Sequence, residues 1–215
     1  MRCTAAIFDM DGTILNTLED LTDSLNHALA ETGFPGRSID EVRAFLGNGI
    51  PRLVELGVPA GTDAARQAEV LAAFNRYYAV HCGDKTRPYD GITEVIRRLR
   101  EDGVKTAVVS NKADYAVQIL CREYFAGLFD EAVGLRDGIR KKPYPDAVNA
   151  VLTALGIDRR EAVYIGDSEV DVHTAENAGM ALVAVDWGFR SRQQLTEAGA
   201  RVIVSDAAGL LAQLR

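Results

Sequence analysis

Short apolar runs recur along the chain, each followed by polar or turn-forming residues. The runs contain many Ala, Val and Ile residues and cover positions 4–8, 104–109, 161–165, 181–185 and 201–204. Such short runs, rich in β-branched side chains, are typical of strands buried on both faces of a parallel sheet. The pattern therefore predicts five strands of this kind.

Amphipathic segments lie between these runs. Ile92, Val95, Ile96 and Leu99 recur at helical spacing and are followed by Gly103, a residue that commonly ends helices. Residues 148–155 show the same spacing before Gly156. Strands that alternate with helices of this length imply right-handed βαβ crossovers. We therefore predict an α/β fold with a doubly wound parallel sheet.

Residues 16–84 interrupt the alternation, because they show helical patterns and no convincing strand. A helix is expected from Thr17 to Gly33, another begins at the capping box Ser38–Glu41, and a long one covers 62–82. An insertion of this length is too long for an ordinary loop. We predict an α/β core of residues 1–15 and 85–215, with an all-helical cap domain, 16–84, inserted after the first strand. A purely decorative helical extension is the alternative.

Composition narrows the classes of function. The chain has 215 residues, with 24 Lys and Arg against 31 Asp and Glu, a net charge of −7, and 47% hydrophobic residues. This balance is globular and argues against nucleic-acid binding, which usually needs a basic surface. Because there is neither an apolar run long enough for a membrane span nor a signal-like start, we expect a cytoplasmic protein without a membrane partner. Three widely spaced cysteines suggest no disulfide framework.

Two carboxylates follow the first predicted strand. Asp9 and Asp11 are separated by one residue, and Gly12 then permits a tight turn. A solvated loop would explain such a pair. However, two crowded carboxylates that are removed from water need a cation or a shared proton.

Polar residues also follow other predicted strands. Ser110 comes after the second, Asp167 and Asp171 after the third, and Lys142 stands before Pro143 in a connecting segment. The carboxyl ends of parallel strands meet at one sheet edge, where ligands of open α/β sheets bind. We therefore expect these side chains and the two acids after the first strand to form one site.

Together these segments resemble the four motifs of the haloacid dehalogenase superfamily, in its phosphatase branch. The motifs are Asp9-Met10-Asp11-Gly12-Thr13, then Ser110, then Lys142, then Gly166-Asp167-Ser168-x-x-Asp171. The resemblance implies a Rossmann-like core with a helical cap. Asp11 points to phosphoryl transfer, because the dehalogenases lack a carboxylate at that position.

Within this superfamily, two segments of the chain most resemble those of phosphoglycolate phosphatases. These segments are 46–50 and 187–191. One departure is Asp90, where proline is expected in a turn that enters a helix. The resemblance thus implies a phosphomonoester hydrolase for a small phosphorylated metabolite, with 2-phosphoglycolate as the expected substrate.

The resemblance also implies roles for individual residues. Asp9 would be the nucleophile that forms an aspartyl-phosphate, and Asp11 the general acid and base. Ser110 and Lys142 would bind the phosphate. Two residues are candidates apart from the resemblance: Asn111 would donate its backbone N–H to the phosphate or would simply form a turn, and Arg52, in the helical insertion, would reach a substrate carboxylate or would be an ordinary solvated arginine.

The same resemblance implies a Mg²⁺ cofactor. Its ligands would be the Asp9 carboxylate, the Asp11 backbone carbonyl and the Asp167 carboxylate, with Asp171 behind them and Thr13 supporting the loop. Four carboxylates and Lys142 carry a net charge of −3 before a phosphate arrives, which favours a bound cation. Oxygen ligands of this kind suit Mg²⁺.

Other functions stay open at this point. A phosphosugar mutase or a pyrophosphatase would use the same core motifs. A receiver domain that is switched by phosphorylation also gathers acids, a hydroxyl and a lysine, but it would be shorter and would pair adjacent acids on its first strand. We expect a monomer or a weak dimer.

Overall fold

The computed structural model describes residues 3–215 in two compact units. One unit contains the described residues up to Leu15 together with Pro88–Arg215, and the other is Asn16–Arg87. The predicted boundary after residue 84 lies three residues before the observed one. Within the described part of the chain, every helix is too short or too polar to cross a membrane.

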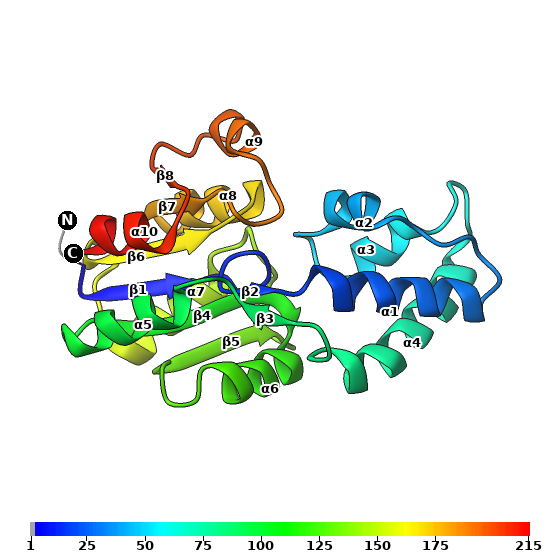
Figure 1. The fold of residues 1–215 in the computed structure, drawn as a ribbon, viewed down its shortest axis with the longest axis horizontal. Helices are drawn as coiled ribbons and strands as arrows, with labels where there is room; N and C mark the ends of the chain where they lie inside the picture. Colours follow the sequence, from blue (N-terminus) through cyan, green and yellow to red (C-terminus); the bar gives the residue numbers. More distant parts are fainter. Residues whose placement is uncertain (1–2) are drawn as a thin grey trace. The chain divides into compact units, whose positions relative to one another are not determined.

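The first unit is built on a six-stranded parallel sheet (Figure 1). Its strands are β1 (Ala5–Phe8), β4 (Lys105–Ala113), β5 (Glu131–Leu135), β6 (Ala162–Gly166), β7 (Ala181–Val185) and β8 (Ile203–Val204). Their order across the sheet is β5-β4-β1-β6-β7-β8, and each neighbouring pair is parallel. The predicted α/β parallel sheet is confirmed.

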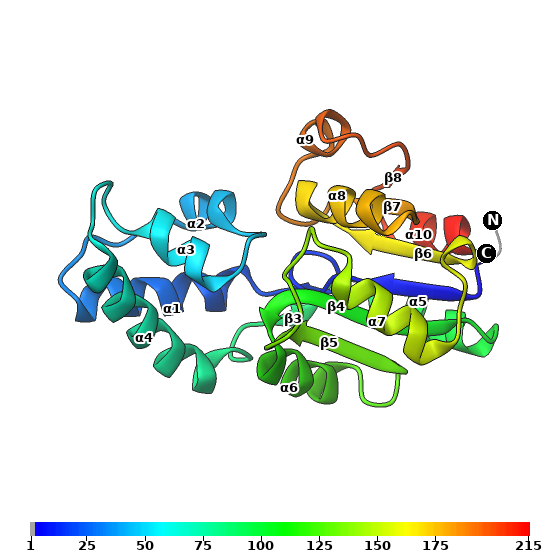
Figure 2. The same ribbon diagram turned by 180° about the vertical axis from the view of Figure 1, so that it is seen from behind.

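Helices cover both faces of this sheet. They are α5 (Ile92–Glu101), α6 (Asp114–Tyr124), α7 (Asp146–Leu155), α8 (Glu169–Ala178), α9 (Arg192–Glu197) and α10 (Ala207–Leu214), with a short 3₁₀ helix at Arg159–Glu161. Helices α5 and α10 lie on the face that Figure 1 shows, and α7 and α8 lie on the face that Figure 2 shows. On the second face, Val148 and Val151 of α7 pack against Ile7 and Tyr164 of the sheet. This apolar layer fixes the central strands.

The register of the central strands sets the position of the polar residues that follow them. Phe8, the last residue of β1, pairs with Val108 on one side and with Ile165 on the other. Chain segments that leave these three strands therefore emerge at the same edge of the sheet. This is the edge at which the sequence predicts a site.

Two strands differ from the predicted pattern. Strand β4 continues past Val109 through three buried polar residues, Ser110, Asn111 and Lys112. The predicted strand ended at Val109, because the prediction used only the apolar run. Strand β5 was not predicted, because only Val133 and Gly134 of its five residues are buried. It lies at the edge of the sheet and needs little apolar surface.

The second unit is helical. It contains α1 (Leu18–Glu31), α2 (Ile39–Phe45), α3 (Ile50–Gly57) and α4 (Ala64–His81). Ser38 forms the predicted capping box with Glu41 at the start of α2. Helix α4 begins two residues after the predicted start at Thr62, and Asp63 caps it by accepting the Arg66 N–H. Helix α3 was not predicted.

Aspartate 20 joins the two ends of the helical unit. Its buried carboxylate accepts hydrogen bonds from the backbone N–H of Lys85, at 3.0 Å, and of Thr86, at 2.8 Å. Just beyond these contacts, β2 (Leu15–Asn16) pairs with β3 (Arg87–Pro88). The two chain segments that enter and leave the unit are thus held to each other.

The departure at Asp90 lies in a tight turn. The Ile92 N–H donates to the Tyr89 carbonyl, and Gly91 has φ 78° and ψ −10°, the values of the third residue of a type II turn. Asp90 therefore occupies the second turn position, where proline is common but not required. The turn forms without the expected proline.

Candidate active site

Aspartate 9 directly follows β1. Its N–H donates to the Ile165 carbonyl at 2.8 Å, which continues the ladder between β1 and β6 by one residue. The Asp9 residue is 7% exposed, and its Oδ1 lies 2.8 Å from Nζ of Lys142. A carboxylate so buried is stable in the charged form only beside a cation.

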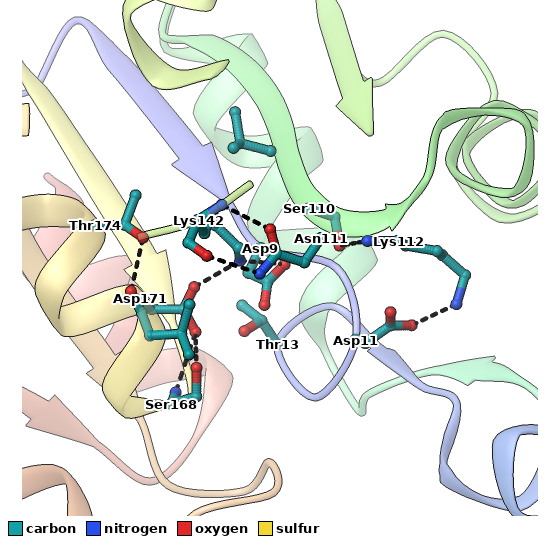
Figure 3. A network of polar contacts seen from close by, with 12 residues as sticks. Asp9, Asp11, Thr13, Ser110, Asn111, Lys112, Lys142, Ser168, Asp171 and Thr174 are labelled. Carbon is teal, nitrogen blue, oxygen red and sulfur yellow. Dashed lines mark hydrogen bonds and ion pairs between the residues drawn. The ribbon is translucent and has the colours of Figure 1, made fainter. Parts of the chain in front are cut away.

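Lysine 142 bridges two carboxylates. Its buried Nζ lies 2.8 Å from Asp9 and 2.7 Å from Asp171. The Asn111 side chain holds the backbone of this lysine, because its Oδ1 accepts the Lys142 N–H at 2.7 Å and its Nδ2 donates to the Lys142 carbonyl at 3.2 Å. Figure 3 shows the bridge and the amide contact together. The end of β4 therefore positions a cation that comes from a distant loop.

Aspartate 171 is engaged on both carboxylate oxygens. Oδ1 accepts hydrogen bonds from Lys142 and, at 3.3 Å, from the Tyr164 hydroxyl. Oδ2 accepts from the N–H groups of Asp167 and Ser168 and, at 2.6 Å, from the Ser168 hydroxyl. The side chain thus caps the start of α8 and orients Lys142, which leaves it little capacity to bind an ion directly.

Aspartate 167 follows β6 and is enclosed by two loops. Its Oδ1 accepts the Thr13 hydroxyl at 2.8 Å, and its Oδ2 accepts the Phe189 N–H at 2.8 Å. A Cβ atom at Gly12 would lie 2.3 Å from Oδ2 of Asp167, and one at Gly188 would lie 2.4 Å from its Cβ. Glycine at both positions lets the backbone approach this carboxylate closely.

Burial and mutual repulsion set the ionisation of this cluster. Burial raises the pKa of Asp9 to about 7; Lys142 opposes this change, and the negative charge of Asp171 adds to it. Burial, with the charges of Asp171 and Asp9, likewise holds the pKa of Asp167 well above its usual range. Although burial disfavours its charged form, the two neighbouring carboxylates keep the pKa of Lys142 well above its ordinary value.

The acidic cluster fits a divalent cation. Asp9, Asp167 and Asp171 each offer a carboxylate oxygen within 4.8 Å of the others. Because Asp171 is already saturated with hydrogen bonds, Asp9 and Asp167 are the two carboxylates that could hold an ion. A cation between them would relieve the repulsion and the desolvation that raise their pKa values.

Two further predicted residues, Asp11 and Ser110, both contact Lys112 (Figure 3). Asp11 Oδ1 lies 2.8 Å from the Nζ of Lys112, and the carboxylate is directed toward that lysine. Asp9 and Asp11 therefore pair with different lysines. Strand β1 ends at Phe8, so the strand geometry that would place side chains two residues apart on the same face does not extend to Asp9 and Asp11. The Ser110 residue is buried, and its hydroxyl accepts the Lys112 N–H at 3.3 Å.

Arginine 52 belongs to the helical unit. It lies in α3, where its exposed guanidinium pairs with Glu55 at 2.7 Å. This pair is an ordinary helical ion pair one turn apart. Its contacts explain an arginine on a solvated helix face and assign no ligand to it.

Sequence reasoning missed several residues that build the site. Lys112 carried no predicted role, although it directly follows Ser110 and Asn111. Ser168 stood within a quoted motif, but its bond to Asp171 was not foreseen. Gly188 and Phe189 belong to the segment 187–191, whose resemblance was noticed without a contact to Asp167. Only the tertiary structure joins these residues to their partners.

Comparisons with known proteins agree with this geometry. Residues 6–185 match the model of the haloacid dehalogenase-like hydrolase family. Phosphoglycolate phosphatases from Pseudomonas syringae pv. tomato and Cereibacter sphaeroides are 32% and 35% identical, over 95% and 86% of this chain and 77% and 85% of theirs.

Solved structures show the same similarity. A candidate phosphoglycolate phosphatase from Lactobacillus delbrueckii subsp. bulgaricus is 42% identical, with a TM-score of 0.95 over 100% of this chain and 99% of that one. CbbY from Rhodobacter sphaeroides, in complex with phosphate, is 26% identical, with a TM-score of 0.78 over 97% and 96%. This chain belongs to the haloacid dehalogenase-like hydrolase family and is one of its phosphatases.

Proposed function

We propose that the protein hydrolyses the phosphomonoester of a small metabolite, with 2-phosphoglycolate as substrate, through an aspartyl-phosphate on Asp9. The observation that carries the proposal is the buried Asp9 carboxylate beside Lys142, with Asp167 in the same cluster. A carboxylate held at a fixed position by a cation is a suitable nucleophile for phosphorus. Covalent catalysis divides one difficult hydrolysis into two easier displacements.

In the first step, an Asp9 oxygen attacks phosphorus and the bond from phosphorus to the ester oxygen breaks. The electron pair of that bond stays on the leaving oxygen, which takes a proton from the Asp11 carboxyl group. Lys142, with the Ser110 hydroxyl, would bind phosphate oxygens and offset their charge. The products are the free alcohol and phosphorylated Asp9.

In the second step, water attacks the same phosphorus while Asp11 accepts a proton from it. The bond between phosphorus and the Asp9 oxygen breaks, and its electron pair restores the Asp9 carboxylate. Inorganic phosphate leaves. Asp11 ends the cycle protonated, as it began.

The proposal includes Mg²⁺ as cofactor. The Asp9 and Asp167 carboxylates would hold it, with the Asp11 backbone carbonyl as a third protein ligand and with Thr13 and Asp171 orienting the loops behind them. When bound, the ion would neutralise charge on the cluster and on the phosphate. Its hardness and preference for oxygen fit this set of donors.

The choice of substrate is supported by the relatives. The curated proteins from Pseudomonas syringae and Cereibacter sphaeroides are named phosphoglycolate phosphatases. We propose that the helical unit Asn16–Arg87 acts as a cap and supplies specificity, with Arg52 as a candidate partner of the substrate carboxylate. Because phosphorylated metabolites are charged and stay inside cells, the proposal includes a cytoplasmic location.

The first prediction tests the nucleophile. Asp9→Asn removes the carboxylate while keeping the size of the side chain, so phosphate release from 2-phosphoglycolate with Mg²⁺ should fall by at least ~10³-fold. The measurement is colorimetric phosphate release by the purified protein, ranked against other phosphorylated metabolites by kcat/KM.

Matched controls separate the mechanism from the substrate. The exposed Asp84, in the helical unit, offers an Asp→Asn variant that should keep wild-type turnover. Wild-type turnover in Asp9→Asn would refute the aspartyl-phosphate mechanism. Preference for another metabolite would refute only the proposed substrate, and isomerisation without phosphate release would indicate a mutase.

A further inference from the structure

We propose that Lys112 is a positioning residue for Asp11, the acid and base of the proposed reaction. This inference rests on the proposed function and adds a residue to it. The observation is an ion pair at the end of β4 between the buried Lys112 and the partly buried Asp11, with 2.8 Å between Lys112 Nζ and Asp11 Oδ1.

The burial of Lys112 makes this contact more than a surface ion pair. The Lys112 side chain is 2% exposed and the Asp11 side chain 20%. An ammonium group withdrawn from water must meet a carboxylate or other acceptors, because uncompensated burial of a charge is costly. Exposed pairs contribute little orientation, whereas a buried pair holds both side chains in place.

The backbone of Lys112 is fixed independently of Asp11. Lys112 lies within β4, and its N–H donates to the Ser110 hydroxyl. The preceding residue, Asn111, is bound through its side chain to the backbone of Lys142. The ammonium group therefore extends from the end of β4, while Asp11 lies in a loop after β1.

The direction of Asp11 suits its proposed role. In an in-line displacement, the leaving oxygen lies on the far side of phosphorus from the nucleophile. An acid that serves this oxygen must therefore reach away from Asp9. Figure 3 shows the Asp11 carboxylate directed toward Lys112 rather than toward Asp171 and Lys142, and the ion pair maintains this direction.

Charge supplies a second reason. In the second step Asp11 must be a carboxylate to accept the proton of water, and the neighbouring ammonium stabilises that form. Three consecutive residues of β4 thus have separate tasks. Ser110 is placed for phosphate, Asn111 holds Lys142, and Lys112 holds Asp11.

The test uses the dependence of the rate on the leaving group. An alkyl phosphate such as 2-phosphoglycolate needs a proton on its leaving oxygen, whereas p-nitrophenyl phosphate releases a stable phenolate and does not. Lys112→Met should lower kcat for the alkyl ester by ~10²-fold and kcat for p-nitrophenyl phosphate by less than ~5-fold. Lys112→Arg, which keeps the charge, should restore much of the alkyl-ester rate.

A double-variant cycle with Asp11→Asn tests the coupling. If Lys112 acts through Asp11, adding Lys112→Met to Asp11→Asn should lower kcat by no more than ~2-fold beyond Asp11→Asn alone. The matched control is Lys105→Met, which removes an exposed lysine from the same strand, paired with Asp130. This variant should keep wild-type kinetics.

Several outcomes would overturn the inference. Equal losses on both substrates, additive losses in the double variant, or wild-type turnover in Lys112→Met would each do so. Circular dichroism melting of each variant reports whether it is folded. If Lys112→Met unfolds, Lys112→Gln replaces it in the comparison of the alkyl ester with p-nitrophenyl phosphate. A wild-type protein that releases no phosphate from any ester would refute the proposed function instead.

Discussion

At the scale of single residues, the site consists of polar side chains that hold one another. Lys142 bridges Asp9 and Asp171, and Asn111 fixes the backbone of that lysine through two hydrogen bonds. Contacts of this kind act on the reaction only through the group that they orient. Their removal should change activity more than it changes the fold.

Asparagine 111 offers a direct test at this scale. Asn111→Ala should lower kcat by ~10-fold to ~100-fold, because the loop that carries Lys142 loses both of its amide contacts. The control is Asn177→Ala. The exposed Asn177 side chain donates a hydrogen bond to the carbonyl of Pro143, the residue after Lys142, so this variant removes a contact to the same loop that does not involve Lys142 itself. Steady-state kinetics measure the effect. An equal loss in both variants would show that general loosening of the loop, and not the position of Lys142, is responsible.

At the scale of elements, loops after β1, β6 and β7 meet around one carboxylate. Thr13 and Phe189 donate to Asp167 from loops that are distant in sequence, and the Trp187 indole N–H donates to the Thr13 carbonyl at 3.1 Å. Parallel strands bring these loops to the same edge of the sheet. The loop after β7 thus helps to set the position of a proposed metal ligand.

Glycine 188 tests this arrangement. In Gly188→Ala, the new Cβ would lie 2.4 Å from atoms of Asp167 and from the Gly12 carbonyl oxygen, so the carboxylate must move. Mg²⁺ affinity measured by calorimetry should fall by at least ~10-fold. Gly209→Ala in α10 is the control and should bind as the wild type does. Unchanged affinity in Gly188→Ala would show that Asp167 does not hold the ion.

At the scale of the whole molecule, the acidic cluster links stability to pH and to the proposed metal ion. Burial raises the pKa of Asp9 from its ordinary value of 3.8 to about 7. Between these values the folded protein binds a proton that the unfolded chain releases. Protonation of Asp9 therefore stabilises the folded state fully at low pH, and this contribution to the free energy of unfolding is lost as pH rises toward 7.

Thermal unfolding in chelator tests this linkage. The free energy of unfolding should decrease between pH 5 and pH 7, by at most about 1.4 kcal/mol per pH unit from this group. Mg²⁺ should raise Tm more at pH 7.5 than at pH 5, because protons compete with it. Asp9→Asn should flatten the pH dependence. A Tm in chelator that rises with pH across this interval would contradict the pKa shift of Asp9.

Much of this architecture could be read from local patterns. Four apolar runs close to the observed β1, β6, β7 and β8 were recognised, because a buried parallel strand needs continuous hydrophobicity. The edge strand β5 escaped notice, since only part of it is buried, and the polar end of β4 resembled a loop. Helix α3 was also missed, because it is short and lies between turns.

By itself, the sequence determined the α/β class, the helical insertion and the identity of the polar residues at the strand ends, since each depends on neighbours within a few positions. Which partner each polar residue meets was decided only by the tertiary structure. The contacts of Lys112 with Asp11 and of Phe189 with Asp167 span 101 and 22 residues. No local pattern encodes such pairs, because the register of the parallel strands brings them together.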